Sequence, residues 1–276
     1  MTSRRSWRTS ARRRCIRTPF NATRKGIRRI VAPIVGIVTF GLLWEALVAV
    51  FDVRRFVLLP PSAILSELLD QPGFYWSNAL VTGRHMLVGL IISLALAVAV
   101  GSVMAASRFI EEATQPVLVL ILVTPWVAYI TSVVLWLDGG EPTILFMVAF
   151  TSFPVFTFGV VGGMKSADPA ARELLASVDA RPWEVLWRLR LPAALPSIFT
   201  TARFAMGLGL AAAYFAEGSA LTTDGLGAIG RRAASFNDAE ILWTTIVSSA
   251  LLGIAGLTLI SLLERYLLRW HASQRS

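Results

Sequence analysis

The sequence is poor in charge and almost free of cysteine and histidine. Only 16% of its 276 residues are charged, whereas 55% are hydrophobic, and its mean hydropathy of +0.64 is too high for an ordinary soluble domain. The single cysteine, Cys15, and the two histidines, His85 and His271, lie far apart with no ligand spacing, so neither a disulfide framework nor a metal site is predicted. This composition indicates a polytopic membrane protein.

Motifs for nucleotide hydrolysis and nucleophilic catalysis are also missing. The stretch GVVGGMKS is similar to a phosphate-binding loop, but Met164 precedes Lys165 where that motif requires glycine, and an apolar run leads into it instead of a strand. No Ser/His/Asp, Cys/His or paired-carboxylate set has supporting context. The chain is therefore predicted to be no enzyme and to bind no cofactor or metal itself.

Six apolar stretches are each long enough to cross a bilayer as a helix, which takes roughly 20 residues. They cover approximately residues 30–51, 80–106, 116–137, 143–164, 197–221 and 241–263. The predicted architecture is all-α, with one transmembrane domain of six helices over residues 30–270. A basic N-terminal tail, residues 1–29, and a short cytoplasmic C-terminal tail, residues 271–276, flank this domain.

Basic residues are unevenly distributed along the chain. The net charge is +9, and 11 of the 26 lysines and arginines precede Ile30. No basic patch interleaved with aromatic residues follows them, so nucleic acid is not a predicted partner. With the N-terminus inside, the cytoplasmic segments hold 20 basic residues and the outer loops hold four. The positive-inside rule therefore predicts that both termini are cytoplasmic.

The N-terminal tail has an alternative interpretation as an organellar transit peptide or a twin-arginine signal, because it is acid-free and rich in arginine and serine. However, no small-residue cleavage site follows it, and the first apolar run is long enough to span the bilayer. We interpret the tail as a disordered cytoplasmic segment whose arginines contact anionic lipid.

Two prolines, Pro125 and Pro154, fall inside the third and fourth predicted spans, where proline frees a backbone carbonyl and bends the helix. Polar and aromatic side chains cluster around them, and helix packing is the alternative role for this cluster. The predicted translocation pathway consists of Thr124, Trp126, Tyr129, Thr131, Ser132, Ser152 and Thr157.

Two acidic residues, Glu45 and Glu217, lie within spans or near their ends, where a charge is costly and usually faces protein or water. A proton relay would require such residues, but it would also require partners in the same span. We interpret both carboxylates as packing or headgroup contacts.

The longest predicted cytoplasmic loop, residues 166–196, reads as helix, turn and helix. Asp168 is suited to cap the first helix with Pro169 at its first position, and Pro182 is suited to open the second. Between them, Asp179 marks a break, because aspartate tolerates the left-handed conformation that often follows a helix end. The loop is predicted to lie against the inner face of the membrane.

This loop resembles the cytoplasmic E-A-A-x(3)-G-x(9)-I-x-L-P loop of the permease subunits of ABC importers. The spacing matches at every anchor, although a Leu-Leu pair replaces the alanines and Asp179 replaces the glycine. The resemblance assigns to ATPase coupling the residues Glu173, Leu174, Leu175, Ala176, Asp179, Ala180, Leu189, Leu191 and Pro192. It also implies that Pro192 and Pro196 end the second loop helix and redirect the chain into the fifth span.

The flanking segments LLPPSAILSELL, PAALPSIFTTARFAMG and AEGSALTTDGLGAIGRRA are similar to permeases of the nitrate, sulfonate and taurine type, and the resemblance covers roughly Trp44 to Trp270. It implies a type I importer in a bacterial inner membrane. In such an importer a pair of permeases, which we expect to be a homodimer of this chain, works with two ATPase subunits that bind ATP and Mg. An extracytoplasmic solute-binding protein would deliver a sulfonate, taurine, nitrate or a similar anion, or a vitamin precursor.

The alternative function is a self-sufficient secondary transporter or channel. Such proteins tend to carry internal repeats and a midplane site with partnered charges, and we find no convincing repeat between the two halves of the sequence. A membrane enzyme ranks third, because the sequence offers no reactive cluster.

Overall fold

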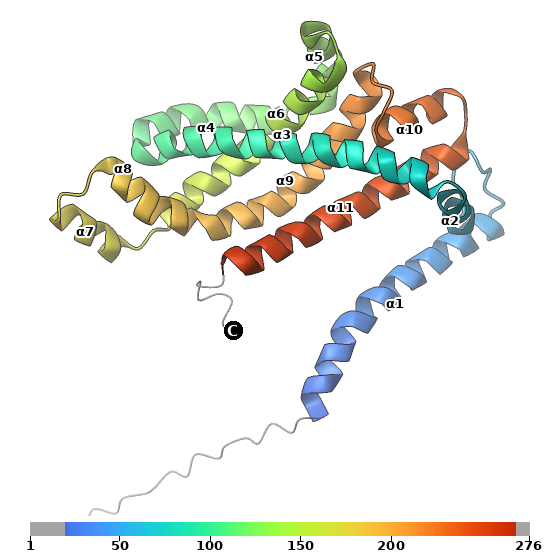
Figure 1. Cartoon of the computed structure of the whole chain (residues 1–276), viewed down its shortest axis with the longest axis horizontal. Helices are drawn as coiled ribbons and strands as arrows, with labels where there is room; N and C mark the ends of the chain where they lie inside the picture. The colour runs from blue at the N-terminus through green and yellow to red at the C-terminus, as the bar shows by residue number, and fades with distance from the viewer. Residues whose placement is uncertain (1–19, 269–276) are drawn as a thin grey trace, which may run out of the picture. The chain divides into compact units, whose positions relative to one another are not determined.

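The computed structural model describes residues 20–268, and the side chains from residue 31 onward (Figure 1). Every regular element in this part of the chain is a helix. The chain divides into two compact units, Met1–Val53 and Arg54–Ser276, which are described separately. Cys15 and His271 lie outside the described residues.

The first unit contains helix α1, Phe20–Val50. Its apolar part, Val31–Val50, is long and apolar enough to cross a membrane, which agrees with the first predicted span. The helix begins ten residues before the predicted start of that span, within the segment that we interpreted as a tail. The rest of the predicted N-terminal tail lies outside the described residues, as does the predicted C-terminal tail.

Four long helices form the core of the second unit: α3 (Pro72–Ala106), α6 (Gly140–Lys165), α9 (Leu191–Ser219) and α11 (Ala239–Leu267). Helix α6 makes its most extensive contacts with α3 and α9. Two shorter helices, α2 (Pro61–Asp70) and α10 (Leu226–Ser235), complete this body. The four long helices match predicted spans in length and apolar character, so the all-α membrane architecture is confirmed.

Small residues set the distance between α3 and α6. Positions 89, 93, 97 and 101 of α3 are Gly, Ser, Ala and Gly, and this spacing of four places them on one face of a helix. A Cβ added at Gly89 would lie 2.5 Å from the Cβ of Val148, and one at Gly101 would lie 2.8 Å from Val160. The difference in residue number between the two partners is the same at both contacts, so the two helices run in parallel.

Helix α9 runs antiparallel to α6, because Gly163 lies against Ala194 and Gly159 against Thr201. The second unit therefore has two ends. The loop end carries the C-termini of α3 and α6 and the start of α9, and the α10 end carries the N-terminus of α3 and helix α10. The six-span prediction requires this arrangement, in which the loop joins two antiparallel helices, α6 and α9, at one end.

The third predicted span is a broken helix. Helix α4 (Arg108–Val123) is followed by its C-cap residue Thr124. A 3-10 turn η1 (Trp126–Tyr129) comes after Pro125, and α5 (Ile130–Leu137) continues the chain. The two parts are bent by 84°. Thr124 is extended, with ψ 128°, because the ring of Pro125 disfavours helical geometry in the residue before it. Five described helices are thus long and apolar enough to span, or six if the bent pair is one span.

The two short loop helices form as predicted. Helix α7 (Pro169–Ser177) is capped by Asp168, whose Oδ1 accepts the backbone N–H of Ala170 at 2.9 Å. Helix α8 (Pro182–Val185) begins at Pro182, and Asp179 between them is left-handed with φ 52°. The N-cap, turn and helix-start predictions are confirmed.

The prediction that Pro192 and Pro196 end the second loop helix is wrong. Helix α8 passes through a π-helical turn, η2 (Leu186–Arg190), directly into α9, where Pro192 is the second residue and Pro196 is internal. Proline lacks an N–H and clashes in an α-helix with the carbonyl four residues earlier. For Pro192 that carbonyl belongs to Arg188, inside the π-helical turn, where the α-helical hydrogen-bond pattern is interrupted. The result is one helical run of 38 residues, Pro182–Ser219 (Figure 1).

Candidate functional site

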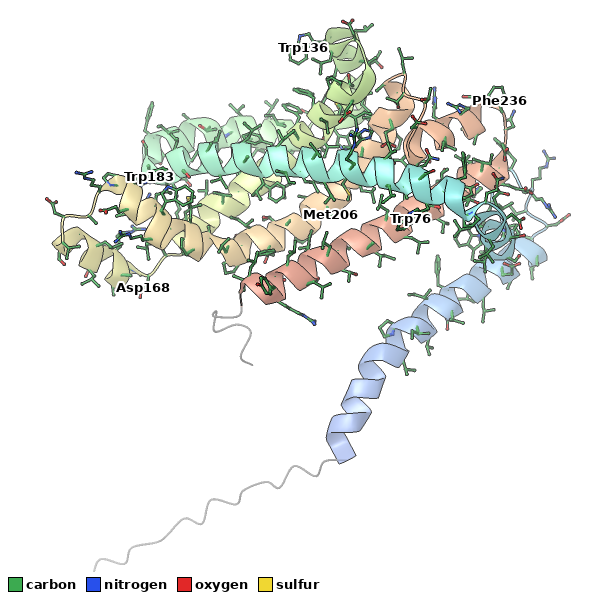
Figure 2. The ribbon with its side chains drawn as sticks, in the orientation of Figure 1. Trp76, Trp136, Asp168, Trp183, Met206 and Phe236 are labelled. Carbon is green, nitrogen blue, oxygen red and sulfur yellow. The ribbon has the colours of Figure 1, made fainter. Side chains whose placement is uncertain are left out.

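The loop end presents an apolar surface that other described elements do not cover. Leu174 is 66% exposed, Val178 67%, Trp183 64% and Trp187 53%. Trp183 stands at this end in Figure 2, and its ring meets that of Trp187 edge to face at 5.2 Å. We call these four residues the loop surface. Exposed large apolar side chains on a loop of this kind typically mark a protein contact.

The predicted coupling residues fall on two sides of this loop. Leu175, Ala180, Leu189 and Leu191 are half-buried, whereas Glu173, Leu174, Ala176, Asp179 and Pro192 are exposed. The structure thus separates a side that faces the helix bundle from a side that faces outward.

Polar contacts and packing fix the loop to the membrane helices. Arg190 donates from Nη1 to the carbonyl oxygen of Ala105 at 3.2 Å. Directly before the loop, Lys165 at the end of α6 forms an ion pair with Glu111 of α4. Leu186 and Leu191 pack against the hydrophobic core. A displacement of the loop would therefore be transmitted to α3 and α9.

The predicted pathway residues do not form one lining. Thr131 and Ser132 are exposed, and Thr124, Trp126 and Tyr129 are half-buried around the break in the third span. By contrast, Ser152 and Thr157 are completely buried in α6, where Thr157 donates to the carbonyl oxygen of Phe153 at 2.8 Å.

A cavity of about 300 Å³ lies beside the break, with Thr124, Tyr129, Phe146 and Phe150 among its lining residues. Tyr129 packs edge to face against Phe150 with ring centroids 5.6 Å apart, and its buried hydroxyl has no hydrogen-bond partner in the described chain. Non-helical backbone at membrane depth is tolerated only where protein covers it or a water-filled cavity borders it. The hydroxyls of Thr124 and Tyr129 are the polar side-chain groups of an otherwise apolar lining.

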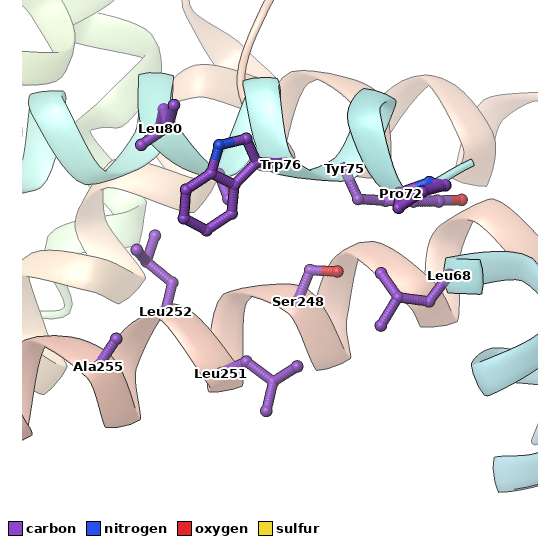
Figure 3. Close-up of a pocket in the computed structure, with 10 residues that line it drawn as sticks. Leu68, Pro72, Tyr75, Trp76, Leu80, Ser248, Leu251, Leu252 and Ala255 are labelled. Carbon is purple, nitrogen blue, oxygen red and sulfur yellow. The ribbon is translucent and has the colours of Figure 1, made fainter. Parts of the chain in front are cut away.

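A second cavity, of about 330 Å³, lies between α3 and α11 and reaches α2 (Figure 3). Trp76, Leu80, Leu251 and Leu252 contribute to its lining, and Ser248 supplies a hydroxyl. None of its lining residues is charged, as is also true of the cavity beside the break.

The α10 end contains a buried polar cluster centred on Glu217, whose side chain is only 1% exposed. Its Oε1 lies 2.8 Å from Nδ1 of His85, and its Oε2 accepts hydrogen bonds from the Thr82 hydroxyl at 2.8 Å and the Gly227 N–H at 2.9 Å. Asn78 lies one turn before Thr82 in α3, and its Oδ1 accepts the N–H of Gly225. We call these four side chains the Glu217 cluster.

A family model described as the binding-protein-dependent transport system inner membrane component matches residues 89–270. This range holds α6, the loop, α9, α10 and α11. The chain belongs to this family of permeases.

Individual relatives of this permease are similar along most of their length. The taurine transport system permease protein TauC of Escherichia coli (strain K12) is 25% identical over 83% of this chain and 86% of its own. The formylaminopyrimidine transport permease protein ThiX of Halalkalibacterium halodurans is 27% identical over 84% and 93%. The riboflavin transport system permease protein RibX of Chloroflexus aurantiacus is 28% identical over 90% and 95%.

These findings confirm the predicted function class. The chain is a membrane-spanning permease subunit of an ABC importer, and it is a multi-pass inner membrane protein.

Sequence reasoning on this permease missed the Glu217 cluster, because it considered partners for Glu217 only within the same span and treated His85 as isolated. The structure corrects both points, since the two residues are 132 positions apart and in contact. A signal was present: Asn78, Thr82 and His85 follow at intervals of four and three in a mainly apolar helix, a spacing that places polar groups on one face.

Proposed function

We propose that this permease works as a homodimer with two ATPase subunits at its loop end and a solute-binding protein at its α10 end. ATP and Mg would bind to the ATPase subunits and not to this chain. The observation that carries the proposal is the loop surface, which is exposed at its apolar side chains and fixed to the membrane helices through Arg190 and the core.

The charge distribution supports a cytoplasmic loop end. Among the described residues of the second unit, seven basic residues lie at or near the loop end. Five lie at or near the α10 end: Arg54, Arg55, Arg231, Arg232 and Arg84, which pairs with Glu141 at the start of α6. The seven are Arg108, Lys165, Arg172, Arg181, Arg188, Arg190 and Arg265. An excess of lysine and arginine marks the cytoplasmic side, so we infer that the C-terminus is cytoplasmic and, with six spans, the N-terminus also.

The mechanism that we propose is alternating access driven from outside the chain. Association of the ATPase subunits on ATP binding would shift the loop, and the helical run Pro182–Ser219 would carry the displacement across the bilayer. The passage would form beside the break at Thr124, where hydroxyls and aromatic rings border a cavity.

The substrate that we propose is a small solute selected mainly by the binding protein. Relatives are named for the transport of taurine, aliphatic sulfonates and bicarbonate, and also of formylaminopyrimidine and riboflavin. A small anion and a vitamin precursor are therefore both within the proposed range. A self-sufficient secondary transporter is the rival function, and it would need no surface for an ATPase.

The loop surface gives a direct test. Replacing both Trp183 and Trp187 by serine should reduce the amount of ATPase that purifies with the permease at least tenfold, because two large exposed rings are lost from the contact. The control is Phe236→Ser, since Phe236 is 79% exposed but lies after α10. If the parent, the Trp183/Trp187 double variant and the Phe236→Ser control recover equal amounts of ATPase, the proposed docking site would be contradicted.

A further inference from the structure

Side chains of other helices hold the N-terminus of α10. The first backbone N–H groups of a helix have no partner within it, and the N-cap residue of α10 is Gly225, which has no side chain to supply one. The N–H of Gly225 donates to Asn78 at 2.9 Å, that of Leu226 to Thr82 at 2.8 Å, and that of Gly227 to Glu217 at 2.9 Å. Three successive donors are thus satisfied from α3 and α9.

Glu217 is the member of the cluster that joins three helices. Its carboxylate lies at the end of α9, contacts Thr82 and His85 of α3, and accepts the N–H of Gly227 at the start of α10. The hydroxyl of Thr82 accepts the Leu226 N–H, so its own hydrogen is directed to Glu217. Each contact of Glu217 can therefore be a donor, as an ionised carboxylate requires.

The backbone around the cluster is shaped to admit this carboxylate. Gly225 has φ +107°, and a Cβ there would lie 2.5 Å from Oε2 of Glu217. A Cβ at Gly227 would lie 1.8 Å from the carbonyl oxygen of Tyr214. Burial of a carboxylate is costly unless it is fully hydrogen-bonded. Because the Gly227 N–H is one of the donors to Glu217, moving α10 away would leave the buried carboxylate short of a hydrogen bond.

Glu217 also lies at the far end of the helical run that begins in the loop. Trp183 and Glu217 belong to the same continuous run, Pro182–Ser219. At 1.5 Å per residue their separation along the helix is about 50 Å. The loop surface at one end and the Glu217 cluster at the other are therefore connected by a single element.

We propose that Glu217 is a positioning residue that locks α10 to α9 and α3, so that movement of the loop is transmitted to the α10 end and solute delivery there is coupled to ATP hydrolysis. The proposal rests on the proposed function, in which the binding protein acts at the α10 end. In this account Glu217 neither contacts the solute nor moves a proton.

The first test follows α10 directly and needs no transport. In a chain with Cys15 replaced, Ala233→Cys places a thiol on the buried face of α10, since Ala233 is 5% exposed. Glu217→Ala removes the acceptor for the Gly227 N–H and the Thr82 hydroxyl, and it should accelerate labelling of this thiol at least tenfold. Glu217→Gln can accept both bonds through its oxygen and donate to His85 in the other tautomer, so its labelling rate should stay within twofold of the parent.

A milder pair of variants covers the case in which Glu217→Ala does not fold. Thr82→Val removes one donor to Glu217 and the acceptor for the Leu226 N–H, whereas Thr82→Ser keeps both. Faster labelling with valine and not with serine supports the proposal. Labelling that is unchanged in Glu217→Ala or, if that variant is unfolded, in Thr82→Val would overturn it.

The second test separates coupling from a merely structural role. In proteoliposomes that contain the complete transporter, Glu217→Ala should retain at least half of the basal ATP hydrolysis, lose its stimulation by the loaded binding protein, and take up solute at least tenfold more slowly. If ATP hydrolysis and uptake both fall by the same factor as the amount of folded complex, the coupling role would be overturned. If the wild type shows no ATP-dependent uptake, the proposed function fails and the coupling role with it, while the labelling result still decides whether Glu217 holds α10.

Discussion

Two adjacent glycines in α6 should respond to the same substitution with opposite signs. A Cβ at Gly162 would meet no atom within 4 Å, whereas one at Gly163 would lie 2.7 Å from the backbone Cα of Ala194 and 2.9 Å from the Cβ of Ser197. Gly162→Ala should stabilise the protein by roughly 0.5–1 kcal/mol, because glycine inside a helix costs about that much relative to alanine. Gly163→Ala should destabilise it by roughly 1–3 kcal/mol, because overpacking forces a backbone shift.

The measurement is the free energy of unfolding in detergent micelles, followed by tryptophan fluorescence against denaturant. The two variants share a helix, a residue type and the added methyl group, so each is the control for the other, and their difference should be about 1.5–4 kcal/mol. The same sign and size of effect at both positions would refute the close approach of α6 and α9 near the loop end.

Three further predictions test topology, the loop turn and the passage. Reporter tags inserted within residues 166–172 should be cytoplasmic and a tag near Asp224 should be outside; an Asp224 tag inside would contradict the six-span topology. Asp179→Gly should preserve uptake because φ is 52° there, whereas Asp179→Pro should reduce it at least tenfold, and equal uptake in both would contradict the turn. Once Cys15 is replaced, a cysteine at Thr131 should react with water-soluble thiol reagents at least tenfold faster than one at Thr157, because only Thr131 is exposed; equal rates would reassign the break to helix packing.

The loop could be predicted closely because its signals are local. The Asp168 side chain reaches an N–H only two residues ahead, and Pro182 and Asp179 each fix the backbone at their own position. These effects depend little on the rest of the fold, so the sequence contains what is needed to place α7 and α8.

The prolines in the apolar segments could not be predicted in the same way. Pro125 accompanies an 84° break, whereas Pro154 lies inside an unbroken α6, and a π-helical turn precedes Pro192. The local chemistry of proline is the same in each case. The outcome depends on which neighbouring groups satisfy the freed carbonyls, and this is a property of the packed helices.

The Glu217 cluster was not predictable from spacing along the chain alone. Glu217 and His85 meet only because α9 and α3 pack with a particular register, which small residues such as Gly209, close to Leu90, help to set. Polar residues on one face of α3 indicated a buried contact, but their partner could be identified only in the folded protein.

The most direct test of the central claim is solute uptake into vesicles that contain the permease, its ATPase partner and the binding protein, with and without ATP in the compartment that faces the loop. The account predicts uptake that requires ATP and the ATPase, and that continues after an ionophore has collapsed the ion gradients. Uptake that persists without the ATPase and stops when the gradient is collapsed would contradict it and identify a secondary transporter.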